Sequence, residues 1–425
     1  MDIQPLTYPV HRGQLANGLR VVVSPDPWAP AVAVNLWYDV GSAHETPGRT
    51  GFAHLFEHLM FSGSAQVASG EHLSQLQALG GEVNATTSFD RTNYFETVPP
   101  GVTSLALWYE ADRLGSLLTA IDQAKLDTER EVVKEEKRQR YDNVPYGDAF
   151  AHLVELTFGS DHPYGHLPIG SMADLDAASL ADVQAFFDRH YRPGNAVLSL
   201  AGAIGEDEGL RLAEDFFGDL PANPPPPRLT VPTWAPIDGL PRADLIRPVP
   251  QEALYWAWRV PPLGADDHEA IGLALSILGD GMTARLHQDL VRTELADAVA
   301  CSDLDLQRGN SLAVVSATAC DGVELERLEE ALLVVWDRFL TEGPSPAEIQ
   351  RAIARATRDW LFSLASLDSR ADALSEATIA FDDPDRINHW LVELAGLDIQ
   401  AITEAAYRWL DPTHRATLSF RKEAA

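Results

Sequence analysis

Basic residues are scarce in this sequence. The chain has 425 residues, with 32 Lys or Arg against 63 Asp or Glu, and its net charge is −31. A surface this acidic repels phosphate backbones and anionic headgroups, so we expect neither a nucleic acid partner nor a membrane partner. The same charge favours solubility and attracts basic peptide segments.

Cysteine and long apolar runs are also scarce. Cys301 and Cys320 are the two cysteines, and they form no C-x-x-C pair and no disulfide framework, which suits a reducing compartment. No apolar run approaches the roughly 20 residues of a membrane-spanning helix. The first residues, MDIQPLTYPVHRGQ, lack the basic and apolar regions of a signal peptide. We therefore expect a soluble, cytoplasmic protein.

The length suits two domains of roughly 200 residues each. A Pro-rich segment, LPANPPPPRLTVPTWAPIDGLP (220–241), excludes helix and predicts a semi-rigid linker. It separates an N-terminal domain (1–219) from a C-terminal domain (242–425) that loosely repeats the strand-then-helix order of the first. Strands and helices mix without regular alternation, so we expect an α+β fold in which a sheet packs against helices.

Periodicity places the elements around the motifs. Valine- and aromatic-rich runs predict strands, whereas apolar residues three and four apart predict helices. The expected strands are 19–26, 31–42, two within 82–99, and 253–262; the expected helices are 48–64, 71–80, 104–118, 127–143 (ended by Pro145) and 267–279.

The motif HLFEH lies in the first of these helices. Residues four apart share one helix face about 6 Å apart, so His54 and His58 can both reach one metal ion. Glu57 lies on the same side and can approach a water molecule on the metal without binding the metal itself. This H-x-x-E-H spacing suits a catalytic zinc site with an open position. The alternative is a pair of ordinary surface or satisfied core histidines, and a third ligand is still needed.

The charged helix 127–143 offers candidates for that ligand. Glu129 and Glu136 are two turns apart and share one face, and Glu131 and Glu135 share another. The alternative interpretation is a solvated helix with charge pairs four residues apart.

Three stretches together resemble the pitrilysin family of zinc metallopeptidases: HLFEH, GGEVNATTSFDRTNYF and EREVVKEEKRQRYDN. LANGLRVVV and HPYGHLPIG (162–170) are also similar to that family, particularly to its half-size members such as bacterial zinc proteases and the catalytic subunit of the mitochondrial processing peptidase. The resemblance spans the chain, and it is strongest over 14–200. It implies two homologous α+β domains, with two chains enclosing a chamber that admits unfolded peptides or presequences.

The resemblance also implies roles for single residues. His54, His58 and Glu136 would hold one zinc ion per chain, with Glu135 as the runner-up for the third ligand. Glu57 would be the catalytic base, and Glu129 would support the ligands by hydrogen bonding. For the substrate, Asn84 matches a residue on the strand to which an extended peptide adds, and Phe95 would line the same cleft unless it is a core aromatic.

The sequence departs from the family in its second half. Many members carry an arginine and, seven residues on, a tyrosine that bind the substrate carbonyl oxygen. Here Arg292 is present, but Asp297 stands at the tyrosine position, with a shorter connection between the two residues, and an ionised carboxylate cannot donate a hydrogen bond. Either a related partner chain carries the Arg/Tyr pair, or a homodimer uses another donor.

The function that these patterns favour is a zinc-dependent endopeptidase. The alternative is a non-catalytic structural or core subunit of a larger complex, since some relatives keep the fold with a degraded motif. The intact His54, Glu57, His58 and Glu136 favour the enzyme. A purely structural zinc site would need a fourth protein ligand, and no cysteine lies near in sequence.

Overall fold

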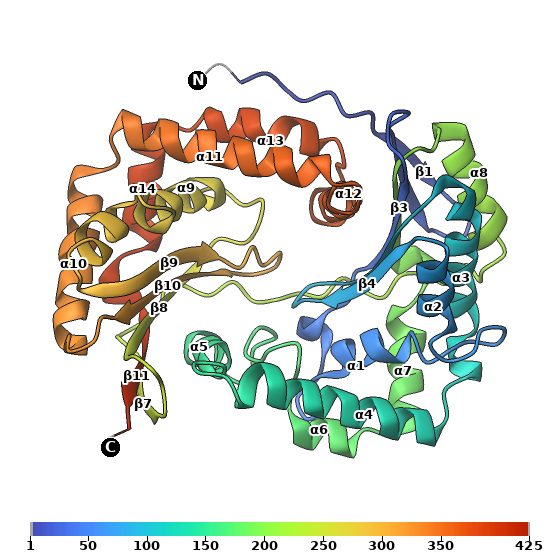
Figure 1. Ribbon diagram of the computed structural model, residues 1–425, viewed down its shortest axis with the longest axis horizontal. Helices are drawn as coiled ribbons and strands as arrows, with labels where there is room; N and C mark the ends of the chain where they lie inside the picture. Colours follow the sequence, from blue (N-terminus) through green and yellow to red (C-terminus); the bar gives the residue numbers. More distant parts are fainter. Residues whose placement is uncertain (1–2, 424–425) are drawn as a thin grey trace.

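The computed structural model describes residues 3–423. Two β-sheets organise it, one of six strands in the order β1-β2-β6-β3-β5-β4 and one of five in the order β7-β11-β8-β10-β9 (Figure 1). Most neighbouring strands are antiparallel, and helices pack on both sheets, which confirms the predicted α+β class. The strands are β1 (His11–Gln14), β2 (Arg20–Pro25), β3 (Val32–Tyr38), β4 (Glu82–Thr87), β5 (Thr92–Val98), β6 (Ala196–Gly202), β7 (Arg242–Arg247), β8 (Ala253–Val260), β9 (Ala296–Asp303), β10 (Ser311–Ala319) and β11 (Ala416–Lys422).

Helices account for most of the remaining ordered chain. Those of the first half are α1 (Phe52–Leu59), α2 (Glu71–Ala78), α3 (Thr103–Ser116), α4 (Gln123–Lys137), α5 (Ala149–Phe158), α6 (Met172–Ala177), α7 (Leu180–His190) and α8 (Glu206–Phe217). Those of the second half are α9 (His268–Gly279), α10 (Leu325–Glu342), α11 (Pro346–Ala365), α12 (Leu367–Phe381), α13 (Arg386–Ala395) and α14 (Ile399–Trp409). None of the helices within 3–423 is both long and apolar enough to cross a membrane.

The two sheets repeat one topology. In the first, β2 runs parallel to β6, and β6, β3, β5 and β4 then follow as antiparallel neighbours. In the second, β7 runs parallel to β11, and β11, β8, β10 and β9 follow in the same way. The weak repeat in the sequence is therefore a full repeat of five strands. Strands β4 and β9 are the equivalent edges.

Each sheet receives a helix from the other half of the chain. Helix α12 packs across β3 and β6 of the first sheet, while α5 packs across β8 and β11 of the second (Figure 1). Apolar residues of α12, such as Leu374 and Ile379, form one buried cluster with Val22, Trp37 and Val197 of the first sheet. Strand β3 is thus covered on both faces and fully buried, which explains its continuous apolar sequence.

The charged helix differs in part from what the sequence predicts. The helix predicted over 127–143 begins earlier, because Asp122 accepts a hydrogen bond from the Lys125 amide (2.9 Å) as its N-cap. It also leaves α-helical geometry before Pro145, since Arg138–Asp142 forms a wider π-type turn. The Pro-rich segment 220–241 contains neither helix nor strand. The domain boundaries themselves stay a prediction.

Candidate metal centre

Helix α1 carries the HLFEH motif on the face turned toward α4 and β4. The helix begins after Gly51, whose φ of 91° lies in the left-handed region that favours glycine. The Glu45 carboxylate accepts hydrogen bonds from the amides of Gly51 and Ala53, both at 2.8 Å, and so caps the helix. The apolar face of α1 is buried in the core. This packing fixes the direction in which the opposite face points.

His54, His58 and Glu136 converge on one point. Glu136 Oε2 lies 3.6 Å from His54 Nε2 and 3.2 Å from His58 Nε2, and the three atoms lie within 4.8 Å of one another. Ligand atoms of a tetrahedral zinc ion, each about 2.0–2.1 Å from the metal, are separated by about 3.3 Å. Two imidazole nitrogens and one carboxylate oxygen are also a donor set of catalytic zinc. The arrangement therefore fits the ion.

The other glutamates of α4 do not reach this point. Glu135 is more than half exposed and pairs with Arg138 (3.1 Å) and Gln139 (2.9 Å). Glu131 pairs with Lys134 at 3.0 Å on the solvent side. Of the two candidates for the third ligand, Glu136 is the one that the structure brings to the histidines.

Glu129 lies beside the cluster. Its Oε2 is 3.8 Å from His58 Nδ1, and its Oε1 accepts a hydrogen bond of 2.8 Å from the Ser62 hydroxyl. A carboxylate at Nδ1 favours the tautomer that leaves Nε2 free to bind a metal. The position thus suits the supporting role that the sequence predicts for Glu129.

Burial and charge set the protonation of the cluster. Burial and the nearby His58 together lower the pKa of His54 to about 4, although Glu136 opposes the change. Burial also opposes protonation of His58, but the hydrogen bond to Glu136 and the surrounding carboxylates raise its pKa overall. The hydrogen bond from His58 lowers the pKa of Glu136. A neutral His54 and an ionised Glu136 are the forms that bind metal.

Glu57 is held next to the metal cluster. Its Oε2 accepts a hydrogen bond of 2.6 Å from the Thr87 hydroxyl on β4. Its Oε1 forms no hydrogen bond with any residue in 3–423. Burial raises the pKa of Glu57, and the Thr87 hydrogen bond opposes that rise. The side chain is oriented by one oxygen and available for proton transfer at the other.

Strand β4 is an edge of the first sheet, as predicted for the substrate strand. Asn84 is exposed on it, and its Oδ1 accepts a hydrogen bond from the Ala85 amide (2.9 Å). Phe95 lies opposite Asn84 on β5, and it is half-buried and lines a cavity. Phe95 therefore lines a hollow beside β4, and its role in substrate binding stays a prediction.

Arg292 lies apart from the cluster. It is exposed and donates a hydrogen bond to Gln288 (3.1 Å), and Asp297 is exposed on edge strand β9. Within 3–423 no hydrogen bond or ion pair joins Arg292 to the histidines or to Glu136. The substrate-binding role of Arg292 stays a prediction.

Sequence reasoning did not identify several contacts of the site. These are Thr87 on Glu57, Ser62 on Glu129, the Glu45 cap, and Arg140, whose Nη1 lies 2.8 Å from Glu136 Oε1. The i,i+4 spacing of Glu136 and Arg140 could have predicted their ion pair from the sequence. The Thr87 and Ser62 contacts join segments far apart in the chain, whereas the Glu45 cap is local. His166 Nε2 lies 2.9 Å from Glu45 and so supports the cap.

A second cluster of ionisable groups is formed by residues of α2, β5 and α3. His72, Glu96, Glu110 and Arg113 are all buried, and Arg113 Nε donates a hydrogen bond of 3.0 Å to Glu110 Oε2. The Arg113 guanidinium lies 4.3 Å from the centre of the Tyr94 ring. Because Arg113 supplies the positive charge here, the cluster needs no metal ion.

The same cluster predicts how stability varies with pH. Burial raises the pKa of Glu110 to about 8, Arg113 opposes the rise, and Glu96 adds to it. This raised pKa gives stability that is present below about pH 4.5 and is lost as the pH rises through 8. We therefore expect the free energy of unfolding of the wild type, minus that of Glu110→Gln, to fall by about 3 kcal/mol between pH 6 and pH 9. Urea denaturation measures this difference. A difference that stays constant, as expected for the exposed control Glu404→Gln, would contradict the protonated Glu110.

Comparisons with known proteins agree with this geometry. Residues 20–162 match the family described as insulinase (peptidase family M16), and residues 177–356 match the peptidase M16 inactive domain. The chain is 27% identical over 413 residues to zinc protease PqqE of Helicobacter pylori, covering 95% of this chain and 91% of the relative. It is 28% identical over 238 residues to the mitochondrial-processing peptidase subunit beta of Saccharomyces cerevisiae, covering 54% and 48%.

Solved structures share the whole architecture. A protease from Helicobacter pylori superposes with a TM-score of 0.90 at 25% identity, over 98% of this chain and 100% of that one. A chain of complex III2 from Candida albicans gives 0.82 at 14% identity, over 97% and 96%, which shows the fold alone. With the sequence matches over both halves, these results assign the chain to the M16 (insulinase/pitrilysin-like) family of zinc proteases, in its half-size, two-domain form.

Proposed function

We propose that this chain is a zinc-dependent endopeptidase that hydrolyses unfolded peptides. The observation that carries the proposal is the convergence of His54, His58 and Glu136, with Glu57 beside them and the open edge of β4 adjacent. A relative over nearly the full length is named a zinc protease, which supports the same reaction class.

His54, His58 and Glu136 would hold the zinc ion, and Glu129 and Arg140 would orient His58 and Glu136. When bound, zinc supplies Lewis acidity, which makes water nucleophilic near neutral pH and polarises a carbonyl group. Glu57 would take a proton from the attacking water at Oε1 and later deliver it to the leaving amine. Thr87 keeps the Glu57 carboxylate oriented throughout.

The substrate would lie extended along β4. An edge strand presents unpaired backbone amides and carbonyls, to which a peptide can add as a further strand. Asn84 is exposed at that edge. A peptide must be unfolded to bind in this way, which supports unfolded peptides or presequences as the substrate class.

We further propose that two chains pair to enclose the substrate. Position 297 carries Asp on the exposed edge strand β9, so the partner is either a related chain with an Arg/Tyr pair or a second copy using another donor. The two cysteines are unpaired, which supports a cytoplasmic location. The mass of the complex purified from its natural source distinguishes the two pairings.

A non-catalytic core subunit is the alternative function. The observation that favours it is the aspartate at position 297, where a hydrogen-bond donor would stabilise the oxyanion. The intact metal cluster and the oriented Glu57 favour the enzyme.

Hydrolysis of a mixed library of unstructured peptides by the purified, zinc-loaded chain tests the proposal. We expect new amino termini, detected by mass spectrometry, with the chelator-treated protein as the blank. Cleavage by this chain alone supports a self-sufficient peptidase. No cleavage either alone or with the partner co-purified from the natural source would support the non-catalytic alternative.

A further inference from the structure

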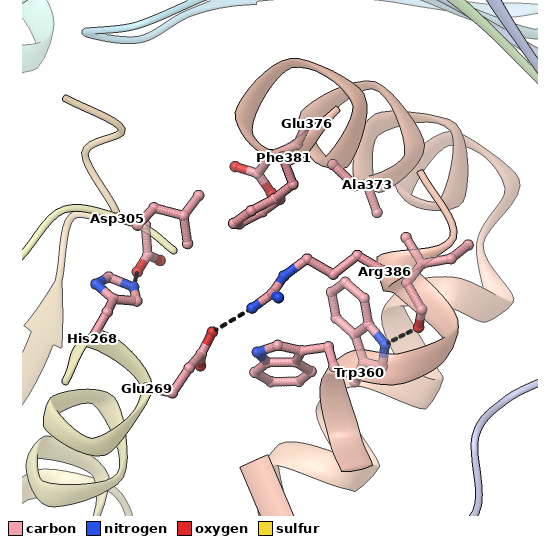
Figure 2. A pocket seen from close by; sticks show the side chains of 12 residues that line it. His268, Glu269, Asp305, Trp360, Ala373, Glu376, Phe381 and Arg386 are labelled. Atoms are coloured by element: carbon pink, nitrogen blue, oxygen red, sulfur yellow. Dashed lines mark hydrogen bonds and ion pairs between the residues drawn. The ribbon is translucent and has the colours of Figure 1, made fainter. Parts of the chain in front are cut away.

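A cavity of about 270 Å³ lies in the second half of the chain, between α9, α11, α12 and α13. Its walls are largely aromatic and aliphatic, with Trp360, Phe381 and Trp390 among the lining residues. Figure 2 shows charged side chains from opposite walls pointing into the same space. An apolar wall with a few converging polar groups is typical of a ligand site.

Most charges in this cavity are paired with each other. His268 Nε2 lies 3.1 Å from Asp305, and Arg386 lies 3.2 Å from Glu269 (Figure 2). The raised pKa of His268, about 9, agrees with its pairing: burial lowers it, but the hydrogen bond to Asp305 and the charge of Asp303 outweigh burial. These pairs compensate each other and need no ligand.

Glu376 is the exception. It comes from α12 and points into the cavity (Figure 2), and within 3–423 it forms no hydrogen bond and no ion pair. Burial raises the pKa of Glu376, and the charges of Asp372, Asp305 and Asp90 add to the rise. Arg91 opposes it, and the resulting pKa is about 7. Glu376 is half-buried, and a carboxylate partly removed from water without a partner costs free energy, which a bound cation would reduce.

The cavity continues toward the strand assigned to the substrate. A second hollow of about 320 Å³ shares Trp360, Ala373 and Glu376 with the first, and Thr86 of β4 and Phe95 of β5 also line it. In the sheet register Thr86 faces Asn93 and Asn84 faces Phe95, so these residues share the face turned to α12. Thr87, which contacts Glu57, lies on the opposite face.

We propose that this cavity is a subsite for an arginine or lysine side chain of the peptide bound along β4. The inference rests on the proposed function, since it takes the peptide to be the substrate. Side chains of an added strand alternate between the two faces, so every second one points toward α12. The aliphatic stem of such a side chain would pack on Trp360 and Phe381, and its charged end would meet Glu376.

The test compares peptides that differ at one position within an otherwise uncharged sequence. Each is Nα-acetylated, so that no terminal amine can occupy the site, and carries arginine, its neutral isostere citrulline, or leucine at each position in turn. Binding to zinc-loaded Glu57→Gln protein is measured by fluorescence anisotropy, which needs no turnover. We expect arginine at one position to bind about tenfold more tightly than citrulline or leucine.

Glu376→Gln, introduced into the Glu57→Gln protein, is expected to reduce the preference for arginine over citrulline to within about twofold. Glu376→Asp is expected to keep part of this preference. The exposed control Glu404→Gln is expected to keep all of it. Thermal melting checks that each variant is folded. An arginine preference that survives Glu376→Gln, or a preference for leucine, or no preference at all, would overturn the subsite.

The subsite and the peptidase can fail separately. If the arginine preference depends on Glu376 but the zinc-loaded wild type cleaves no peptide, the subsite stands and the proposed activity falls. If the wild type cleaves peptides with equal kcat/KM for arginine and citrulline at every position, the activity stands and the subsite falls.

Discussion

Glu57→Gln is expected to lower kcat for peptide hydrolysis by about 10³-fold while leaving zinc binding intact. Glutamine has nearly the shape of glutamate, and its carbonyl oxygen can still accept the hydrogen bond from Thr87. It cannot take a proton from water, and general acid–base catalysis is worth about 10²–10⁴-fold in rate. The measurement is steady-state hydrolysis of a peptide from the library, with bound zinc determined on the same preparation.

Glu404→Gln is the matched control, because Glu404 is exposed on α14 and does not belong to the proposed substrate strand. It undergoes the same chemical change without facing the metal cluster, so we expect a wild-type rate. Turnover by Glu57→Gln within a few-fold of the wild-type rate would remove Glu57 from the mechanism. Loss of zinc from Glu57→Gln would instead show that Glu57 is needed to hold the metal site together.

Glu136→Gln is expected to weaken zinc binding by at least about 100-fold, whereas Glu135→Gln leaves it unchanged. Loss of a supporting residue around a zinc site typically costs 10–100-fold in affinity, and loss of a direct ligand should cost more. The two glutamates are neighbours in sequence, but Glu136 lies 3.2 Å from His58 Nε2 and Glu135 faces solvent. Competition with a chelating zinc indicator measures both affinities.

Comparing Glu136→Gln with Glu135→Gln separates loss of a ligand from general effects on α4. Both substitutions remove one negative charge from the same helix, so a loss confined to Glu136→Gln reports on the ligand position. Equal losses in the two variants would show that helix stability or net charge causes the effect. A loss confined to Glu135→Gln would show that Glu135, and not Glu136, is the third ligand.

Local patterns predicted the part of the site that lies on single elements. The i,i+4 spacing of His54 and His58 required only that α1 be a helix, and periodicity already indicated that helix. Spacing alone could not choose between Glu135 and Glu136. That choice depends on how α4 is rotated against α1, which follows from packing of the buried Val133 and Leu126.

Contacts between distant segments could not be predicted. Thr87 and Glu57 are joined because β4 passes beside α1, and no periodicity in either segment encodes that meeting. The subsite at Glu376 depends on α12 of the second half packing across the first sheet. The sequence indicated two domains with a proline-rich segment between them, and within that picture α12 belonged to the second domain alone.

The reciprocal exchange of α5 and α12 has a consequence for how the molecule can be divided and moved. Each half of the chain repeats the same sheet topology, but neither half can complete its own fold. Each sheet is covered by a helix that lies on the other side of residues 220–241 in the sequence. A chain cut in that segment would leave two fragments, each with a bare apolar sheet face prone to association. In the intact chain, the same interlocking fixes the spacing between β4 and the Glu376 cavity by side-chain packing, whatever the stiffness of the connecting segment.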